Sequence, residues 1–145
     1  QCLTERDPAS IAATDDGLVV PVVRHADRRS LVDLGREIDR LAAATKAGKA
    51  TREDLTGSTF TITSLGTLGG LLATPIINHP ECAILGVHKI AKRPMVLGDK
   101  IEIRDMMNLS ISVDHRLTDG YDAARFVATV KESLETPGLL WLDSV

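Results

Sequence analysis

The amino-acid sequence predicts a two-layer α/β sandwich, in which helices pack on a β-sheet. Several short segments are continuously apolar or alternate between polar and apolar residues, as strands do, and two longer segments place apolar residues at helical spacing. Because strands and helices are interleaved along the chain, both layers belong to one fold. The 145 residues are enough for one domain with a buried core.

The first part of the chain predicts one strand and one amphipathic helix. Residues 1–16 are polar and irregular, whereas 17–23 form a continuous apolar run that predicts a buried strand, with Pro21 indicating an edge or a bulge. Ser30 can cap the helix that follows, and Gly48 can end it. The apolar stripe that we expect to face the core consists of Leu31, Leu34, Ile38 and Leu41.

Strands dominate the middle of the chain. Residues 59–63 alternate between threonine and apolar residues, which predicts a strand with one wet face, and a glycine-rich loop follows at 66–70. Residues 83–87 predict a second buried strand. Further strands are expected at 95–97, 100–104 and 107–113, the first two joined by a hairpin turn at Gly98 and Asp99.

A second helix is expected at 121–135. Its inward residues are predicted to be Ala124, Val127 and Leu134, and Pro137 stops it. The chain therefore interleaves its predicted strands with two long helices.

Composition and charge exclude several classes of protein. The net charge is −3 and aromatic residues make up 3%, so the chain offers neither the basic surface nor the stacking platforms of a nucleic-acid-binding protein. No apolar run approaches the ~18 residues of a membrane span. Two cysteines, Cys2 and Cys82, give no disulfide framework, which indicates a reducing compartment. Because Gln1 is not a natural start, we expect a piece of a longer chain.

The segment 112–120 carries the residues most suited to chemistry. His115 lies where a strand is expected to end and a helix to begin, so its imidazole can stand at the mouth of a cleft between two rigid elements. Imidazole takes up and returns a proton near neutral pH, which makes His115 a candidate general base; a structural histidine at a strand end is the alternative. Asp119 can belong to the same site or can simply cap the second helix.

Two other kinds of site compete with this interpretation. A zinc site could use the four residues His79, Cys82, His88 and His115, but they form no compact metal-binding motif, and Cys82 is better explained as a small core residue. A serine hydrolase could use His115 as its base, but the chain has no Gly-x-Ser-x-Gly elbow. The sequence therefore predicts no metal site.

The run His115-Arg116-Leu117-Thr118-Asp119-Gly120 resembles the active-site motif of the dihydrolipoamide acyltransferases, the core components of the 2-oxo acid dehydrogenase complexes. Further segments resemble the same family in the same order, at 16–21, 60–66, 74–78, 83–87 and 106–110. The resemblance covers nearly the whole chain from about Ile11 onward. It implies a chloramphenicol acetyltransferase-like fold with a mixed sheet.

The resemblance also implies a role for each site residue. His115 matches the general base that deprotonates a thiol, and Asp119 matches an aspartate that shapes the active site through salt bridges. Thr63 takes the position of the hydroxyl residue that stabilises the oxyanion of the tetrahedral intermediate; an ordinary strand threonine is the alternative. Contacts with coenzyme A are implied for Ser64, His88, Lys89 and Ile90.

The resemblance further implies an assembly. Members of the family form homotrimers with active sites between subunits, so His115 and Thr63 are expected to act from different chains. The trimers build larger cores, and the tail 139–142 (Leu-Leu-Trp-Leu) either makes such a contact or packs on its own domain. A thiamine-dependent 2-oxo acid decarboxylase and dihydrolipoamide dehydrogenase are the implied partners, in the bacterial cytoplasm rather than the mitochondrial matrix.

The resemblance implies that residues 1–145 correspond to the C-terminal share of a single acyltransferase catalytic domain. The family's domain begins upstream of Asp16, and nothing in the chain matches its lipoyl and subunit-binding domains, so lipoamide would come from a lipoyl domain that this chain does not contain. The predicted function is a dihydrolipoyllysine-residue acyltransferase, which moves an acyl group between dihydrolipoamide and coenzyme A. A non-catalytic assembly domain of the same fold is the alternative. The acyl group, which is branched-chain, acetyl or succinyl, stays open.

Overall fold

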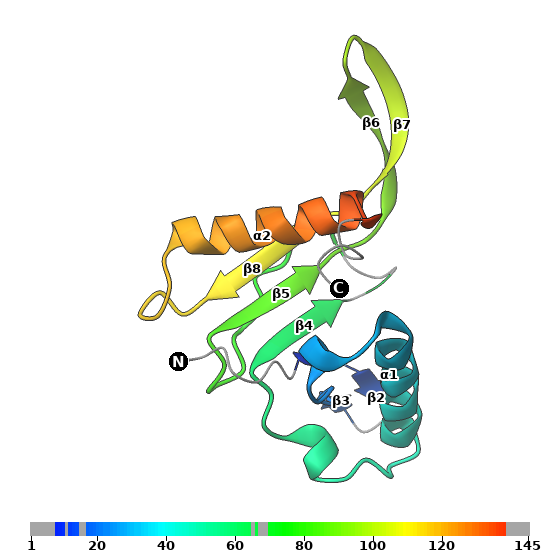
Figure 1. Cartoon of the computed structure of the whole chain (residues 1–145), viewed down its shortest axis with the longest axis vertical. Helices are drawn as coiled ribbons and strands as arrows, with labels where there is room; N and C mark the ends of the chain where they lie inside the picture. Colours follow the sequence, from blue (N-terminus) through cyan, green and yellow to red (C-terminus); the bar gives the residue numbers. More distant parts are fainter. Residues whose placement is uncertain (1–7, 11, 15–16, 65, 67–69, 139–145) are drawn as a thin grey trace.

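The computed structural model describes residues 8–10, 12–14, 17–64, 66 and 70–138. Figure 1 shows their arrangement, and the elements are β1 (Pro8–Ser10), β2 (Ala12–Thr14), β3 (Gly17–Val19), η1 (Ala26–Arg28), α1 (Leu31–Lys46), η2 (Glu53–Leu55), β4 (Phe60–Ser64), β5 (Ala83–Val87), β6 (Ala91–Leu97), β7 (Lys100–Met106), β8 (Leu109–Val113) and α2 (Gly120–Glu135). The glycine-rich loop 67–69, Cys2 and the tail 139–142 lie outside the described residues.

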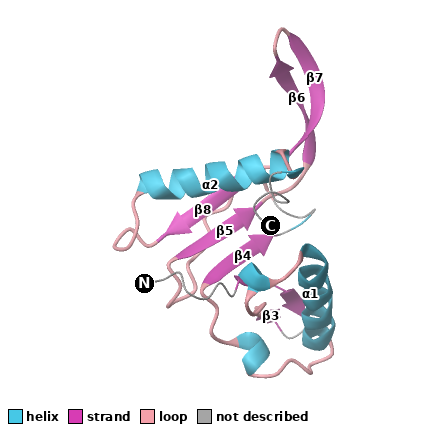
Figure 2. Ribbon diagram, in the orientation of Figure 1, coloured by secondary structure: helices cyan, strands magenta, loops and turns pink. Residues whose placement is uncertain are grey.

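The central sheet has four strands in the order β1-β4-β5-β8. β1, β4 and β5 run parallel, whereas β8 is antiparallel to β5, so the sheet is mixed. Helix α2 lies along this sheet as a second layer (Figure 2), and the ring of Phe126 on α2 meets that of Phe60 on β4 with centroids 5.6 Å apart. The predicted two-layer α/β sandwich with a mixed sheet is therefore confirmed.

β5 forms the centre of the core, as its apolar sequence predicts. Ala83, Ile84 and Leu85 are almost entirely buried because β5 has a neighbouring strand on each side. The apolar run at 17–23 is a strand only as far as Val19, which pairs with β2, but Val22 and Val23 beyond it are buried. The strand stops before Pro21, which has no N–H for a ladder.

The two helices begin where their capping residues predict. The side chain of Ser30 accepts the backbone N–H of Asp33 at the start of α1, and Gly48 after its end has a φ of 66° that suits glycine. The predicted inward stripe of α1 is wrong in part, because Leu41 is buried but Leu31 and Ile38 are 63% and 47% exposed. Periodicity finds the apolar face of a helix, but burial depends on what packs against that face.

Helix α2 shows a similar difference on its inner face. Ala123 is buried and Val127 half-buried, whereas Ala124 and Leu134 are exposed. The prediction is therefore wrong for Ala124, because Ala123 holds the buried position expected of its neighbour. It is also wrong for Leu134, which lies on the same helix face as Val127 but is 55% exposed near the end of α2.

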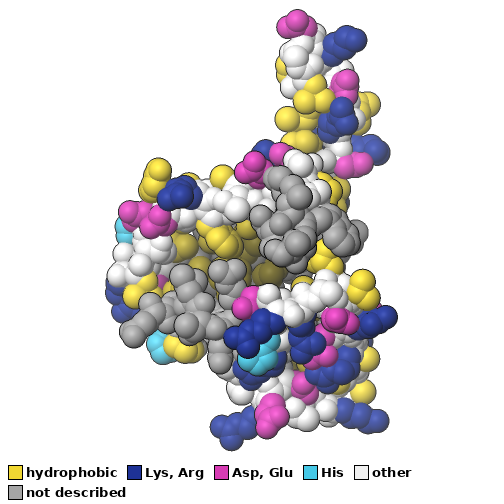
Figure 3. All heavy atoms as spheres, in the orientation of Figure 1, with side chains coloured by type: hydrophobic (Ala, Val, Ile, Leu, Met, Phe, Trp, Pro, Cys, Tyr) yellow, Lys and Arg dark blue, Asp and Glu magenta, His cyan; other side chains and the backbone are white. Residues whose placement is uncertain are grey.

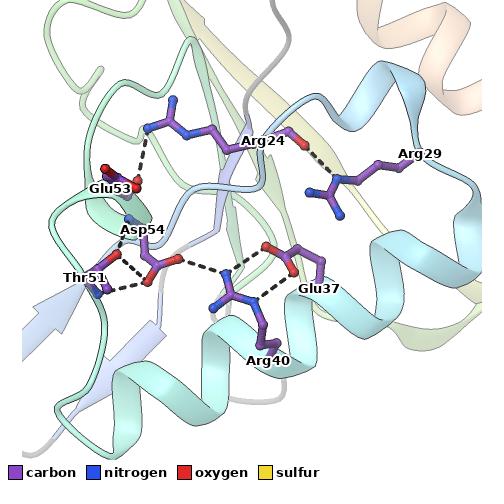
Figure 4. Close-up of polar contacts among 7 residues, drawn as sticks. All are labelled: Arg24, Arg29, Glu37, Arg40, Thr51, Glu53 and Asp54. Atoms are coloured by element: carbon purple, nitrogen blue, oxygen red, sulfur yellow. Dashed lines mark hydrogen bonds and ion pairs between the residues drawn. The ribbon is translucent and has the colours of Figure 1, made fainter.

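A polar network fixes α1 to the η2 segment (Figure 4). The guanidinium of Arg40 bonds both carboxylate oxygens of Glu37 at 2.9 Å and reaches Asp54 at 2.8 Å. Asp54 also accepts the N–H and the hydroxyl of Thr51. These hydrogen bonds, first that of Arg40, lower the pKa of Asp54 to about 2. The network therefore ties α1 to the η2 segment that follows it.

β4 differs from the expected strand with one wet face. Thr61 is 2% exposed, whereas Ile62 on the opposite face is 37% exposed. The reason is a buried acceptor, because the hydroxyl of Thr61 donates to the carboxylate of Glu81 at 2.6 Å. The threonine face is therefore covered, and sequence alternation alone did not reveal its partner.

The β6–β7 hairpin projects away from the rest of the fold (Figure 1). Its turn is at Gly98 and Asp99, as predicted, but the two strands are longer than expected and pair over seven residues each. One face of the hairpin carries the cross-strand pairs Pro94–Ile103 and Val96–Ile101. Val96, Ile101 and Ile103 are 69%, 76% and 74% exposed, and Figure 3 shows hydrophobic side chains over the hairpin.

Candidate functional site

The sheet has two functional ends, because the strands alternate in direction. β4 and β5 finish at one end, beside the start of β8, so Ser64, Val87 and Leu109 lie together there. β8 finishes at the opposite end, beside Ala83 at the start of β5. His115 follows β8, and the turn that carries it leads into α2 on the left of Figure 1.

The turn that carries His115 is held on both sides of the histidine. The N–H of Asp114 donates to the carbonyl of Cys82 at 2.8 Å, which extends the ladder between β5 and β8. The Asp114 carboxylate accepts the backbone N–H of Arg116 at 3.0 Å and its guanidinium at 2.6–3.2 Å. The side-chain hydrogen bonds of Arg116, then its backbone N–H, lower the pKa of Asp114 to about 2. Arg116 therefore braces the turn, as expected of a structural residue.

The imidazole of His115 is exposed. Its side chain forms no hydrogen bond or ion pair with the part of the chain that the structure describes. An exposed imidazole on a braced turn is accessible to a substrate, and its position is set by the backbone alone.

Asp119 is the N-cap of α2. Its Oδ1 accepts the N–H of Asp122 at 3.0 Å, and its backbone carbonyl accepts that of Ala123. This is the capping role that its place before the helix predicts. It lies four positions after His115, at the same end of the sheet, and Oδ2 is not engaged by the described residues, so an additional role in the site is compatible with the cap.

Thr63 lies on β4 at the other end, opposite a glycine. It is in register with Gly86 of β5, which is in register with Ser110 of β8. A Cβ on Gly86 would lie 2.6 Å from the Ser110 hydroxyl and 3.2 Å from Nε2 of His88. Only glycine therefore lets these two side chains lie across the strand beside Thr63.

One pocket lies at this end of the sheet. It has a volume of about 250 Å³ and is lined by seven residues, Ser64, Gly66, Val87, His88, Lys89, Ile90 and Met107. The four residues implied as coenzyme A contacts are all among them. The structure therefore brings this predicted set together, whereas neither His115 nor Thr63 lines the pocket.

His88 is fixed by a chain of hydrogen bonds that sequence reasoning missed. Its Nε2 lies 2.8 Å from the hydroxyl of Ser110, and that hydroxyl donates to the carbonyl of Ala73 at 3.1 Å. Because Ser110 has one hydrogen to give, we assign the hydrogen in the first contact to Nε2. His88 is 8% exposed, so these hydrogen bonds hold its ring against the wall of the pocket.

Thr63 and His115 do not meet within one chain. Val113 is three residues beyond Ser110, and β8 is two strands from β4, so Val113 lies roughly 14 Å from Thr63 at ~3.4 Å per residue and ~4.8 Å per strand. His115 is two residues further away in the chain. A hydrogen bond spans about 3 Å, so the two side chains cannot act on one atom from the same subunit.

A buried carboxylate at the His115 end also escaped the sequence analysis. Glu81 is 6% exposed and accepts hydrogen bonds from Ser58, Thr61 and Asn78. It stands in a loop just after Pro80, where a charged residue is normally solvated, so no sequence signal pointed to its burial.

Neither a metal centre nor a membrane span is found in the described residues. In these ranges, no group of three or more His, Cys, Asp or Glu side chains is placed to hold a metal ion. No helix in the same ranges is long and apolar enough to cross a membrane.

Comparison with known sequences gives one family. Residues 9–142 match the profile of the 2-oxoacid dehydrogenases acyltransferase (catalytic domain). The lipoamide acyltransferase component of the branched-chain alpha-keto acid dehydrogenase complex of Pseudomonas aeruginosa is 55% identical over 130 residues, which are 90% of this chain and 30% of that protein. The dihydrolipoyllysine-residue succinyltransferase component of the 2-oxoglutarate dehydrogenase complex of Bartonella vinsonii subsp. berkhoffii is 52% identical over 130 residues, 90% of this chain and 32% of that protein. The chain thus spans about a third of the length of these curated relatives.

Solved structures give the same fold. The dihydrolipoamide acetyltransferase of Azotobacter vinelandii superposes with a TM-score of 0.86 at 41% identity, over 90% of this chain and 54% of that one. The cubic core of a pyruvate dehydrogenase multienzyme complex has the same TM-score and coverage at 40% identity. The Azotobacter enzyme was investigated for the role of a serine, a histidine and an asparagine in its catalytic mechanism. The histidine follows the serine by 52 positions, and the asparagine follows the histidine by 4. Thr63, His115 and Asp119 have the same separations.

Proposed function

Because the chain belongs to the 2-oxoacid dehydrogenase acyltransferase family, we propose that it transfers an acyl group between dihydrolipoamide and coenzyme A, with His115 as the general base. The observation that carries this proposal is an exposed imidazole on a turn braced from both sides. The shared spacing with the serine, histidine and asparagine of the Azotobacter enzyme supports the same residue set.

His115 would act on the thiol of the acceptor. A thiol with a pKa near ~8.5 is largely protonated at neutral pH, and the thiolate is the nucleophile. By taking the proton, His115 allows the sulfur to attack the acyl carbon of the thioester, and by returning it to the departing sulfur His115 completes the exchange. Asp119 would help to shape the site from the start of α2, without giving up its cap.

Thr63 would stabilise the oxyanion of the tetrahedral intermediate through its hydroxyl. Since it lies roughly 14 Å or more from the His115 turn in one chain, by strand spacing alone, we infer that the two side chains come from neighbouring subunits. Thr63 in place of the serine of the Azotobacter enzyme keeps the hydroxyl donor, and Asp119 in place of its asparagine keeps an oxygen acceptor.

The pocket beside Thr63 fits part of coenzyme A. Its volume of about 250 Å³ suits the narrow thiol-bearing arm rather than the whole molecule. The apolar wall of Val87, Ile90 and Met107 suits the methylene groups of that arm, and the cationic Lys89 at the exposed side suits a phosphate. Ser64 and His88 are the remaining predicted contacts. Lipoamide would be delivered on a lipoyl domain that residues 1–145 do not include.

Exposed apolar surface supports the proposed homotrimer. A two-stranded hairpin is marginally stable by itself in water, and β6–β7 nonetheless projects with Val96, Ile101 and Ile103 exposed on one face. A neighbouring subunit would cover that face. The cubic core among the similar structures supports further assembly of the trimers, and the relatives' names support a place in a 2-oxo acid dehydrogenase complex. The proposal includes a thiamine-dependent decarboxylase and dihydrolipoamide dehydrogenase as its other components.

We also propose which part of the catalytic domain residues 1–145 form and where in the cell the protein acts. Coverage of 54% of the Azotobacter structure supports the view that residues 1–145 correspond to a share of one catalytic domain, which we propose is its C-terminal share. The exposed apolar stripe of α1 would then meet the rest of that domain. The bacterial relatives support the bacterial cytoplasm as the location rather than the mitochondrial matrix.

The decisive experiment measures acyl transfer from acyl-CoA to dihydrolipoamide by the full catalytic domain and its His115→Ala variant. We expect kcat to fall roughly 10²–10⁴-fold with the oligomer unchanged. His25→Asn is the matched control, because Asn tolerates the left-handed φ of 51° at this distant, exposed histidine. Full activity of His115→Ala would leave a non-catalytic assembly domain as the function.

The same assay decides the acyl group. Identities of 55% to a branched-chain enzyme and 52% to a succinyltransferase do not separate the two. Isobutyryl-CoA, succinyl-CoA and acetyl-CoA are therefore compared by kcat/KM, since selectivity is a ratio of these constants. Lys89 is the cation at the pocket. If its partner is a phosphate of coenzyme A, which all three substrates share, Lys89→Met should leave the order of the three kcat/KM values unchanged.

A further inference from the structure

The carboxylate of Glu81 is a buried charge that the proposed chemistry does not use. It accepts the hydroxyl of Ser58 at 2.5 Å and the amide of Asn78 at 3.2 Å on one oxygen, and the hydroxyl of Thr61 at 2.6 Å on the other. Its own N–H donates to the carbonyl of Asn78 at 2.8 Å. No Lys, Arg or His forms an ion pair with it in the described part of the chain.

A buried carboxylate is stable only if hydrogen bonds replace the water that it has lost. A carboxylate that is 6% exposed has lost nearly all its water, and three uncharged donors replace that water here. The donors come from separate places, namely the segment before β4, β4 itself and the loop before β5. Glu81 therefore fixes three backbone segments to one another at a single end of the sheet.

That end is the one that carries His115. The residue after Glu81 is Cys82, whose carbonyl accepts the N–H of Asp114 at 2.8 Å. Asp114 opens the His115 turn, and its carbonyl accepts the N–H of Leu117 at 2.9 Å. In Figure 1 the starts of β4 and β5 lie on the same side as the connection from β8 to α2. Because the His115 side chain has no hydrogen bond to the described residues, its place depends on this backbone anchor.

We propose that Glu81 is a positioning residue for His115, acting through Cys82 and Asp114. The carboxylate of Glu81 fixes residues 81 and 82 to β4. The carbonyl of Cys82 then holds the His115 turn in the position from which the imidazole can reach a substrate in the neighbouring subunit's pocket. The assignment of a base role to His115 rests on the proposed function, but the clamp itself does not.

Two substitutions separate hydrogen bonding from filling space. In Glu81→Gln, the amide oxygen can still accept from Ser58 and Asn78, and the amide nitrogen can donate to the hydroxyl of Thr61 once that hydroxyl rotates. Glu81→Leu keeps much of the volume but leaves all three donors without a partner. We expect Glu81→Gln to behave as the wild type and Glu81→Leu to loosen the turn.

The loosening is read out in two independent ways. Hydrogen exchange by mass spectrometry should show faster exchange in Glu81→Leu for the peptide over 113–118 and no change for 86–90 at the pocket end. Turnover should fall roughly 10–100-fold, the size of effect expected when a reacting group is misplaced by about 1 Å, with KM for coenzyme A unchanged. Glu81→Gln should show the exchange rate and the turnover of the wild type.

Each outcome decides one claim. Unchanged exchange at 113–118 in Glu81→Leu, or a lower Tm with wild-type kcat, overturns the positioning role. Faster exchange in a protein whose wild type shows no acyl transfer keeps the clamp and overturns the proposed function instead. If Glu81→Leu does not assemble, Asn78→Ala removes one donor from an exposed loop residue and gives the same test, with a smaller expected change in the same direction.

Discussion

At the end of the sheet where β8 stops, the structure offers an exposed imidazole on a braced turn, which does not line the pocket that contains His88. At the end where β4 and β5 stop, it offers that pocket, a buried histidine held by Ser110, and the hydroxyl of Thr63 nearby on β4. Under the proposed function, the first end presents the general base, whereas the second receives coenzyme A.

The difference between the two ends follows from strand direction. β8 is antiparallel to β5, so a residue that follows β8 must lie at the end opposite to residues that follow β4 and β5. No side-chain rotation can close a gap set by several residues and two strand spacings. A catalytic site that needs both ends must therefore be completed by a second copy, in which the ends of different chains face each other.

Mixing two inactive variants tests most directly whether one active site uses the two sheet ends of different chains. His115→Ala and Thr63→Val are unfolded together, refolded and assayed for acyl transfer. If each site takes His115 from one chain and Thr63 from its neighbour, random mixing restores about a quarter of the wild-type sites, while each variant alone stays inactive. The measurement is activity per subunit as the mixing ratio changes.

A null result in the mixture would oppose the shared site. Refolded wild type is the control for losses during assembly, and mixing after separate assembly should give no recovery. Activity that never exceeds the sum of the two variants would mean that both side chains serve one chain, contrary to the distance between them.

The next largest effect concerns Thr63 by itself. Thr63→Val keeps the shape of the side chain and removes its hydroxyl, so kcat should fall roughly 10²–10³-fold, as when one oxyanion donor is lost. Thr63→Ser keeps the donor and should retain most activity, while KM for coenzyme A should stay the same in both because Thr63 does not line the pocket. A Val variant with wild-type kcat would make Thr63 an ordinary strand residue.

Local sequence patterns predicted much of the fold. The Ser30 cap, the α2 cap at Asp119, the apolar β5 and the turn at Gly98 depend on residues close together in the chain, and each is where the pattern indicates. The resemblance to a family supplied the four pocket residues, which contiguous strand ends then bring together. These features follow from short-range geometry and from one motif.

Other features depend on contacts that no local pattern contains. Thr61 is buried because Glu81 arrives from a distant loop, and Leu31 is exposed because nothing in the described residues covers it. The Ser110–His88 contact needs Gly86 between them, across two strands. Burial and side-chain partners at such positions are decided by tertiary neighbours, which a single sequence does not show.

A smaller effect is expected at the pocket, where Lys89 is the proposed contact for a phosphate of coenzyme A. Lys89→Ala removes an exposed cation beside the pocket, so KM for coenzyme A should rise ~2–5-fold, the effect expected of a solvent-screened contact, and the rise should vanish at high salt. Lys131→Ala is the matched control, since Lys131 is an exposed lysine on α2 that pairs with Glu135. An equal rise in both variants would indicate general electrostatic attraction rather than a contact at the pocket.

The smallest expected effect is a loss of stability at acid pH from the contact between Asp114 and Arg116 in the His115 turn. Arg116 holds the pKa of Asp114 at about 2, below its ordinary 3.8, so the folded state binds the proton less readily than the unfolded chain. The stability from this contact is then fully present above about pH 4 and is lost as the pH falls towards 2. The difference in Tm between wild type and Asp114→Asn should be constant from pH 7 to about 4 and shrink below that.

The difference in Tm between the wild type and Asp114→Asn is used because Asp54 also has a pKa of about 2 and contributes the same acid sensitivity to both proteins. Since Asp114 is the residue between the β8 ladder and His115, hydrogen exchange at 113–118 should rise in the same pH interval, whereas exchange at 86–90 should not. A Tm difference that stays constant down to pH 2 would show that the Asp114–Arg116 contact does not stabilise the turn. His115 would then depend on the Cys82 carbonyl alone, which would make Glu81→Leu the more damaging change at that end of the sheet.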